Sequence, residues 1–184
     1  MLAAGASRRM GANKLLLMLD GEPLVRRASR YALAAGLEPL VVVLGHESER
    51  VQLALADLPC RFAFNAEPSS PMSSSLHRGL EYLPADIDAV VIMLPDMVGV
   101  TEHMVRAIAS ASAETAAPLV ASRYGDVLAP PILFRRPLFA ELLASQGEGC
   151  GKSVVERHRA DALLLDWPPD ALVDVDTPED FARR

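Results

Sequence analysis

The stretch Pro39-Leu40-Val41-Val42-Val43-Leu44-Gly45 reads as a strand buried on both faces. It is a short run of branched apolar residues closed by a glycine, and such continuous runs are typical of parallel strands that are covered by helices. Residues 89–94 repeat the pattern, and weaker runs at 61–64, 118–121 and 162–165 are further strand candidates. Buried strands therefore recur along the whole chain.

Helical periodicity fills the segments between these strands. Residues 24–35 place apolar side chains on one helical face, and Gly36 follows as a helix-ending glycine. Similar patterns follow Thr101, a candidate N-cap, and Pro137. Alternating strands and helices predict an α/β fold with a parallel sheet between two helical layers. Because there is no internal repeat and no linker, we expect residues 1–184 to form a single domain.

The beginning of the chain departs from this scheme. Residues 1–5, Met-Leu-Ala-Ala-Gly, look like the last part of a strand that enters a turn. The first strand of a doubly wound sheet is usually central, so either the chain starts upstream of Met1 or the fold tolerates a first strand of roughly three residues.

Composition restricts the class of function. The net charge of −6 and the aromatic content of 5% argue against nucleic acid as a partner. No apolar run reaches the roughly 18 residues of a membrane span, and no secretion signal is visible. Cys60 and Cys150 are too few for a disulfide framework, which fits a cytoplasmic location. The expected partner is a small molecule.

Residues 2–14 combine small residues with cations in a pattern that suits phosphate binding. The residues around Gly5 let the backbone approach a ligand closely, and backbone N–H groups in such a turn can surround phosphate oxygens. Arg9 and Lys14 would add positive charge. An ordinary surface turn with two cations is the alternative that this pattern leaves open.

Two other segments carry chemistry. Ser73 and Ser75 precede a helical pattern and could cap it or face a ligand. Asp96 follows the strand at 89–94, where open α/β sheets bind ligands, and Asp174 and Asp176 lie on one side of an extended stretch. Carboxylates in such places suit Mg²⁺, although they could instead cap a terminal helix.

These motifs resemble one family. Residues 2–14 match every fixed position of the L-A-A-G-x-S-x-R-M-G-x-x-K signature of the MobA-like nucleotidyltransferases. The sequence at 14–17 and 21–24 is most similar to the molybdenum cofactor cytidylyltransferase branch. The guanylyltransferase branch usually carries Gly-Gly and Asp before the lysine, where this chain has Ala12 and Asn13.

The resemblance implies a fold, a reaction and a set of sites. The fold would be a Rossmann-like three-layer sandwich with a mostly parallel sheet. The reaction would transfer CMP from CTP, with Mg²⁺, to a phosphorylated acceptor such as molybdopterin, and a molybdoenzyme or its maturation factor is a further partner to consider. The implied nucleotide-binding residues are Ala3, Ala4, Gly5, Ser7, Arg9, Lys14, Ser73, Ser75 and Asp96. Arg9, Lys14 and Asp96 would be catalytic, Asp96 and Asp176 would hold the metal, and Lys152 would meet the acceptor.

Departures from the family pattern leave alternatives open. Pro71 replaces a glycine, Val98 replaces a proline, and residues 147–152 are altered. The nucleotide could be GTP or the acceptor another phosphorylated metabolite. A different class, a degenerate nucleotide-binding or cofactor-binding maturation factor, is the second alternative. A Walker A motif is excluded because position 146 is glutamine and a helical pattern, not a strand, precedes it.

Overall fold

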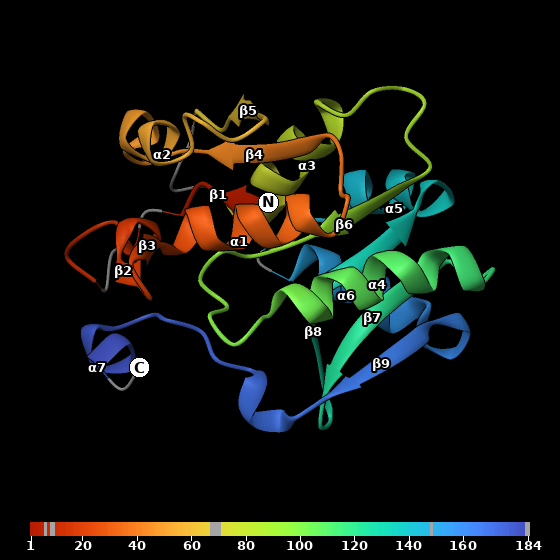
Figure 1. The fold of residues 1–184 in the computed structure, drawn as a ribbon. Coiled ribbons are helices and arrows are strands. Elements are labelled where there is room, and N and C mark those ends of the chain that lie inside the picture. The colour runs from red at the N-terminus through yellow and green to blue at the C-terminus, as the bar shows by residue number, and fades with distance from the viewer. Residues whose placement is uncertain (6, 8–9, 67–70, 148, 183–184) are drawn as a thin grey trace.

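In the computed structural model, residues 1–182 are described except for 6, 8–9, 67–70 and 148. A three-stranded sheet in the order β5-β4-β1 and a four-stranded sheet in the order β6-β8-β7-β9 lie side by side, with helices on both sides (Figure 1). The bounds of these strands are β1 Leu2–Ala3, β4 Leu40–Leu44, β5 Cys60–Phe64, β6 Ala89–Ile92, β7 Leu119–Tyr124, β8 Val127–Arg135 and β9 Leu163–Trp167. The hydrogen bond from Leu2 N–H to the Met93 carbonyl (3.0 Å) joins the two sheets. The predicted α/β sandwich is confirmed.

Strand directions agree with the prediction of a mostly parallel sheet. β4 is parallel to β1 and to β5, and β9 is parallel to β7, while β8 runs antiparallel to both of its neighbours. A separate short hairpin, β2 (Met18–Leu19) with β3 (Glu22–Pro23), leads into the first long helix. Neither β8 nor this hairpin was among the predicted strands.

The helical layers divide the core. Helices α1 (Leu24–Ala34) and α4 (Glu102–Glu114) lie on one face of the sheet, together with α2 (Ser48–Ala54) at its edge (Figure 1). The other face is covered by α3 (Met72–Glu81), α5 (Phe139–Ala144) and α6 (Cys150–Arg157). The predicted helix ends hold, because Gly36 has a φ of 74° after α1 and the Thr101 hydroxyl accepts the Met104 N–H at 3.3 Å.

The last segment of the described chain returns to its beginning. Residues 172–176 cross from β9 toward the β2–β3 hairpin, and α7 (Pro178–Ala182) ends beside that hairpin (Figure 1). Val175 is fully buried in a small apolar cluster with Leu24 and Val98, against which Leu17 and Phe181 pack. This return brings acidic residues near position 176 to the carboxyl ends of β1 and β6.

At the opposite end of β1 there is a cavity of about 100 Å³ between β4 and β6. Met1, Leu40, Val41, Ala89 and Val90 line it, and α3 closes one side through Leu80. The first strand has two residues, so it is even shorter than predicted, and the cavity lies where a longer strand would continue.

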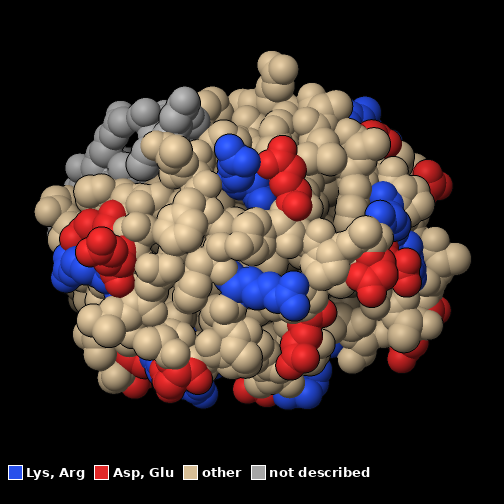
Figure 2. Space-filling model, turned by 90° about the horizontal axis from the view of Figure 1, so that it is seen from above, with Lys and Arg blue, Asp and Glu red and all other residues tan. Residues whose placement is uncertain are grey.

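Within the described residues, no helix is long and apolar enough to cross a membrane. On the face drawn in Figure 2, basic and acidic side chains are interspersed and neither sign forms a continuous field.

Candidate functional site

Backbone pairing brings Asp96 and Asp176 together although 79 residues separate them in the sequence. After β6 the chain passes Pro95, and residues 96–98 then run antiparallel to 173–175. Val98 N–H donates to the Val173 carbonyl at 2.9 Å, and Val175 N–H donates to the Asp96 carbonyl at 3.1 Å. Both aspartates are therefore fixed at the carboxyl end of the sheet, where α/β proteins bind ligands.

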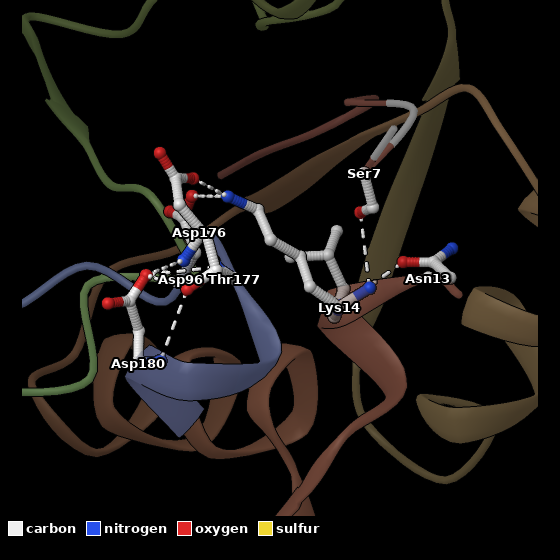
Figure 3. A network of polar contacts seen from close by, with 8 residues as sticks. Ser7, Asn13, Lys14, Asp96, Asp176, Thr177 and Asp180 are labelled. Carbon is white, nitrogen blue, oxygen red and sulfur yellow. Dashed lines mark hydrogen bonds and ion pairs between the residues drawn. The ribbon is translucent and has the colours of Figure 1, made fainter. Parts of the chain in front are cut away.

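The Lys14 ammonium lies between these two carboxylates (Figure 3). Its Nζ is 2.5 Å from Asp96 Oδ2 and 2.7 Å from Asp176 Oδ1. The side chains of Lys14 and Asp96 are 14% and 20% exposed, while that of Asp176 is 40% exposed. Desolvation opposes the charge of Lys14, but the two carboxylates outweigh it and raise the lysine pKa, so the ammonium stays charged at neutral pH.

The turn before Lys14 holds the lysine backbone in place. Lys14 begins a short 3₁₀ helix, Lys14–Leu16, and its N–H donates to the Ser7 hydroxyl at 3.1 Å. Ser7 adopts a positive φ of 48°, a strained conformation for a serine. Asn13 caps the same helix by accepting the Leu15 N–H at 3.1 Å, and its amide also donates to the His46 carbonyl at 3.3 Å.

Asp176 is held from the other side by a helix cap. The Asp180 carboxylate accepts the Thr177 N–H at 2.9 Å and the Thr177 hydroxyl at 2.8 Å, while the Asp180 N–H donates back to that hydroxyl at 3.2 Å (Figure 3). This reciprocal arrangement is a capping box in which aspartate replaces the usual glutamate. Thr177 and Pro178 therefore occupy the cap and the first helical position.

A third carboxylate stands beside the pair. Asp174 is an exposed residue whose side chain alternates with buried Val175, so it faces the same side of the extended stretch as Asp176. Desolvation, followed by the negative charges of Asp96 and Asp176, raises the pKa of Asp174 to about 6. The site thus gathers more negative charge than Lys14 alone can neutralise.

The serine segment begins α3. Ser73 and Ser75 are both buried, and the Ser75 hydroxyl accepts a 3.0 Å hydrogen bond from the amide of Asn65, which follows β5. Ser73 N–H donates to the Gly147 carbonyl at 3.2 Å. The serine segment therefore touches Gly147, which lies five residues before Lys152, the residue that the resemblance places toward the acceptor. Lys152 itself is exposed on α6.

Other predicted site residues are placed as follows. Ala3 and Ala4 are buried with their side chains in the core, so what they can offer a ligand is backbone, whereas Gly5 is exposed. Arg9 lies outside the described residues, and its predicted role stays a prediction. The Walker-like stretch 147–153 follows α5 and continues into α6, with no strand before it, which agrees with its rejection as a P-loop.

Sequence reasoning did not find Arg27, which supports the site from α1. Its guanidinium donates to the Val98 carbonyl at 2.8 Å and lies 5.1 Å from the centre of the Tyr31 ring. This contact clamps the segment that carries Asp96. The partners are 71 residues apart in the sequence, so no local signal marks the arginine.

The donor set fits one small divalent cation. Two carboxylate oxygens converge on the single point that the Lys14 ammonium fills, and carboxylate oxygen is the ligand that Mg²⁺ and Mn²⁺ prefer. Among the described residues no group of three acidic, histidine or cysteine side chains forms a metal site on its own. Two protein carboxylates suffice for Mg²⁺, which usually completes its coordination with water or with oxygens of a bound ligand.

Comparison with known proteins places these features in context. The family model of the MobA-like NTP transferase domain matches residues 1–162. Molybdenum cofactor guanylyltransferase of Rhodobacter capsulatus is 28% identical over 183 residues, covering 99% of this chain and 91% of that protein. Purine catabolism protein PucB of Bacillus subtilis (strain 168) is also 28% identical, over 196 residues and with coverages of 98% and 91%.

Solved structures show the same architecture. Rv0371c from Mycobacterium tuberculosis H37Rv superposes with a TM-score of 0.87 at 27% identity, covering 99% of this chain and 93% of that one. The complex of Rv0371c with manganese gives a TM-score of 0.80 at 26% identity, with coverages of 99% and 94%. The fold is therefore Rossmann-like, as the resemblance implied.

Proposed function

The chain belongs to the MobA-like NTP transferase family, and we propose that it transfers the nucleotidyl group of a nucleoside triphosphate to a phosphorylated acceptor of the molybdopterin type. Membership of this family makes it a nucleotidyltransferase. The observation that carries the finer proposal is the convergence of Lys14, Asp96 and Asp176 at the carboxyl end of the sheet. These residues supply the cation and the carboxylates that a triphosphate with its divalent metal requires.

The proposed chemistry is an in-line displacement. A phosphate oxygen of the acceptor forms a bond to the α-phosphorus, and the bond from that phosphorus to the bridging oxygen breaks, so that its electron pair leaves with pyrophosphate. No protein general base is needed, because a phosphate nucleophile is already ionised near neutral pH. Catalysis then consists of positioning and of stabilising negative charge on the phosphoryl oxygens.

Each named residue has a task in this scheme. Asp96 and Asp176 would hold a divalent cation, Mg²⁺ in our proposal, which when bound neutralises charge on the phosphate oxygens. Lys14 donates to those oxygens, and the turn from Gly5 to Ser7 presents backbone to the triphosphate, with Arg9 as a further cation. Ser73 and Ser75 face base and ribose, and Lys152 meets an anionic group of the acceptor.

Two nucleotides compete in this proposal. CTP is favoured by Ala12 and Asn13, which differ from the Gly-Gly and Asp of the guanylyltransferase branch. GTP is favoured at least as strongly by the relatives, since the Rhodobacter capsulatus relative is named a molybdenum cofactor guanylyltransferase. The ratio of kcat/KM for CTP and GTP with one acceptor decides between them.

Pyrophosphate release tests the proposal. The purified protein is assayed with each of the four NTPs, with Mg²⁺ or Mn²⁺, and with phosphorylated acceptors that include molybdopterin. We expect acceptor-dependent release of pyrophosphate with one preferred NTP. In Asp96→Asn the rate of release should fall about 10³-fold, because the variant loses a carboxylate that would hold the metal and so loses stabilisation of charge in the transition state. Asp161→Asn, at an exposed aspartate of a surface turn, is the matched control and should keep full activity.

Two outcomes would contradict the proposal. Folded Asp96→Asn with near-normal turnover would remove the role of the carboxylate pair. Tight NTP binding without turnover for any acceptor would instead favour a maturation factor that holds nucleotide or cofactor without reaction. A pull-down with a molybdoenzyme before and after turnover would test whether such an enzyme receives the product.

A further inference from the structure

The Lys14 ammonium occupies the position that the proposed function gives to the metal. Its nitrogen is 2.5 Å from one Asp96 oxygen and 2.7 Å from one Asp176 oxygen. A magnesium ion bound to the same two oxygens would lie about 2.1 Å from each of them. Such an ion would coincide almost fully with the lysine nitrogen, so these two oxygens can serve the ammonium or the metal but not both.

Electrostatic repulsion also prevents the ammonium and a metal ion from occupying the carboxylate pair together. The ammonium and a divalent cation repel each other, and the repulsion is strong where side chains are mostly withdrawn from water. Lys14 and Asp96 are both largely buried, at 14% and 20% exposure. Metal binding at the pair therefore requires the lysine side chain to move away.

The lysine is built so that its side chain can move while its backbone stays. The Lys14 N–H is tied to the Ser7 hydroxyl and the Lys14 carbonyl accepts the Leu17 N–H at 3.1 Å. The ammonium, in contrast, is a point charge on a flexible four-carbon stem, and it can exchange carboxylate oxygens for phosphate oxygens with little loss. A triphosphate bound beside Gly5 and Ser7 would offer such oxygens next to this stem.

We propose that Lys14 is an internal counter-ion that blocks metal binding at the Asp96–Asp176 pair until a triphosphate draws its ammonium away. This inference rests on the proposed function and adds an order to it. Free metal binds weakly, and nucleotide and metal bind with positive coupling, because each removes an obstacle to the other. The carboxylates remain neutralised in the resting enzyme and become available when substrate arrives.

Binding of Mn²⁺ without nucleotide is the decisive measurement. Free Mn²⁺ is counted by its electron paramagnetic resonance signal in the wild type, in Lys14→Met and in Lys14→Gln, at pH 8. We expect both variants to bind Mn²⁺ at least about 10-fold more tightly than the wild type. Arg61→Met, which removes an exposed cation of β5, is the matched control and should leave Mn²⁺ binding unchanged.

Two further arms place the bound ion and test the coupling. Combining Lys14→Met with Asp96→Asn should abolish the gain, which assigns the ion to the pair. Adding a non-hydrolysable α,β-methylene NTP should tighten Mn²⁺ binding by about 10-fold or more in the wild type, after binding by the nucleotide alone is subtracted, and much less in Lys14→Met.

The inference is overturned if folded Lys14→Met and Lys14→Gln bind Mn²⁺ no more tightly than the wild type. Circular dichroism melting checks that both variants fold. Failure of the proposed function looks different: the wild type then neither releases pyrophosphate nor binds Mn²⁺ with nucleotide present. If the wild type turns over but neither variant gains affinity for Mn²⁺, the counter-ion role is contradicted and the proposed function is not.

Discussion

Asp174 makes the site sensitive to pH through its own titration. Its pKa is raised to about 6 in the folded protein by desolvation and by the neighbouring Asp96 and Asp176. An aspartate in an unfolded chain titrates near 4. Between about pH 4 and 6 the folded state therefore binds more protons than the unfolded state, so this residue's contribution to stability is lost as the pH rises through that window.

We expect Asp174→Asn to flatten the pH dependence of stability between about pH 4 and 6 and to stabilise the protein modestly at pH 7. The effect stays modest because Asp174 is exposed and water screens its charge. Urea unfolding at several pH values in the presence of EDTA measures it. A variant that loses stability at pH 7 would contradict the expectation, and Asp161→Asn controls for loss of a surface charge.

Among single residues, the sequence predicted those that stand in motifs and missed those that act through partners distant in the sequence. Lys14, Asp96 and Asp176 could be found because each stands at a recognisable boundary of a strand or helix. Asn13 and Asp180 carry a local signal, since each caps the short helix next to it, and a closer reading of their spacing would have found both. Arg27 could not be found, because its partner is set by tertiary packing.

Among the elements, the contact between residues 96–99 and 171–175 decides where Asp176 lies. A Cβ added to Gly99 would be 2.1 Å from the Ala171 carbonyl oxygen, so only glycine allows the two backbones to approach this closely. We expect Gly99→Ala to push the segments apart, to lower stability by about 2 kcal/mol and to reduce transfer activity at least tenfold. Urea unfolding and pyrophosphate release measure the two effects.

Gly151→Ala is the control for this prediction. Gly151 lies in α6, and an added Cβ would meet nothing within 4 Å. Alanine is the better helix former, so stability should rise by about 0.5–1 kcal/mol. Equal losses in both variants would show that the close approach at Gly99 is not responsible.

Arg27 of α1 also fixes the position of the segment that carries Asp96. Arg27→Ala removes the hydrogen bond to the Val98 carbonyl and the packing on Tyr31, and we expect a loss of about 1.5–3 kcal/mol in stability. Arg26→Ala, one position along α1, breaks an exposed ion pair with Asp57 and a hydrogen bond to the Ala54 carbonyl, and should cost less stability than Arg27→Ala. Guanidinium unfolding of both variants gives the comparison, and a smaller loss for Arg27→Ala than for Arg26→Ala contradicts the clamp.

The missed strand β8 shows why elements are harder to predict than patterns suggest. Pro130 and Pro131 argue against a strand, because proline cannot donate to a sheet. In the structure the pairing register of β7 with β8 shifts between Ala121 and Ser122, and the two prolines lie opposite this irregularity. The Pro131 carbonyl accepts a hydrogen bond from the Ser122 hydroxyl at 2.8 Å, and the Pro130 carbonyl accepts one from the Tyr124 hydroxyl at 2.9 Å. Side-chain hydroxyls of β7 thus replace the backbone hydrogen bonds that the sheet lacks opposite the two prolines.

For the whole molecule, the cavity beside Met1 lies next to the start of the short first strand. It lies between β4 and β6, and the buried Met1 amino group, whose pKa burial lowers to about 5, donates to the Val41 carbonyl at 3.0 Å. An engineered extension at Met1 would enter this space. Four residues of strand span about 13 Å and could pair with both neighbours.

We expect an apolar extension such as Val-Ile-Ala-Val joined to Met1 to stabilise the protein by about 2 kcal/mol, because it fills about 100 Å³ of cavity. For a protein of this size the midpoint of thermal unfolding should rise by about 4 °C or more. A Gly-Ser-Gly-Ser extension of equal length is the control. Equal midpoints for the two extensions would show that the cavity does not accept a strand.

The global arrangement was predictable because buried strands and amphipathic helices alternate along the chain. The mostly parallel sheet and its two helical layers follow from that pattern, and the shortened first strand follows from residues 1–5. What the pattern could not supply is the antiparallel direction of β8 and the return of residues 172–182 to the hairpin at 18–23. Both depend on contacts between segments far apart in the sequence, which periodicity does not encode.

The return of the C-terminal segment has a consequence for synthesis on the ribosome. Lys14 emerges early, but one of its two carboxylate partners follows 162 residues later. A nascent chain that already has its turn, its strands and most of its helices still lacks half of the acidic pair. In the proposed scheme the chain therefore cannot complete its metal site until the segment around residue 176 has left the exit tunnel and docked.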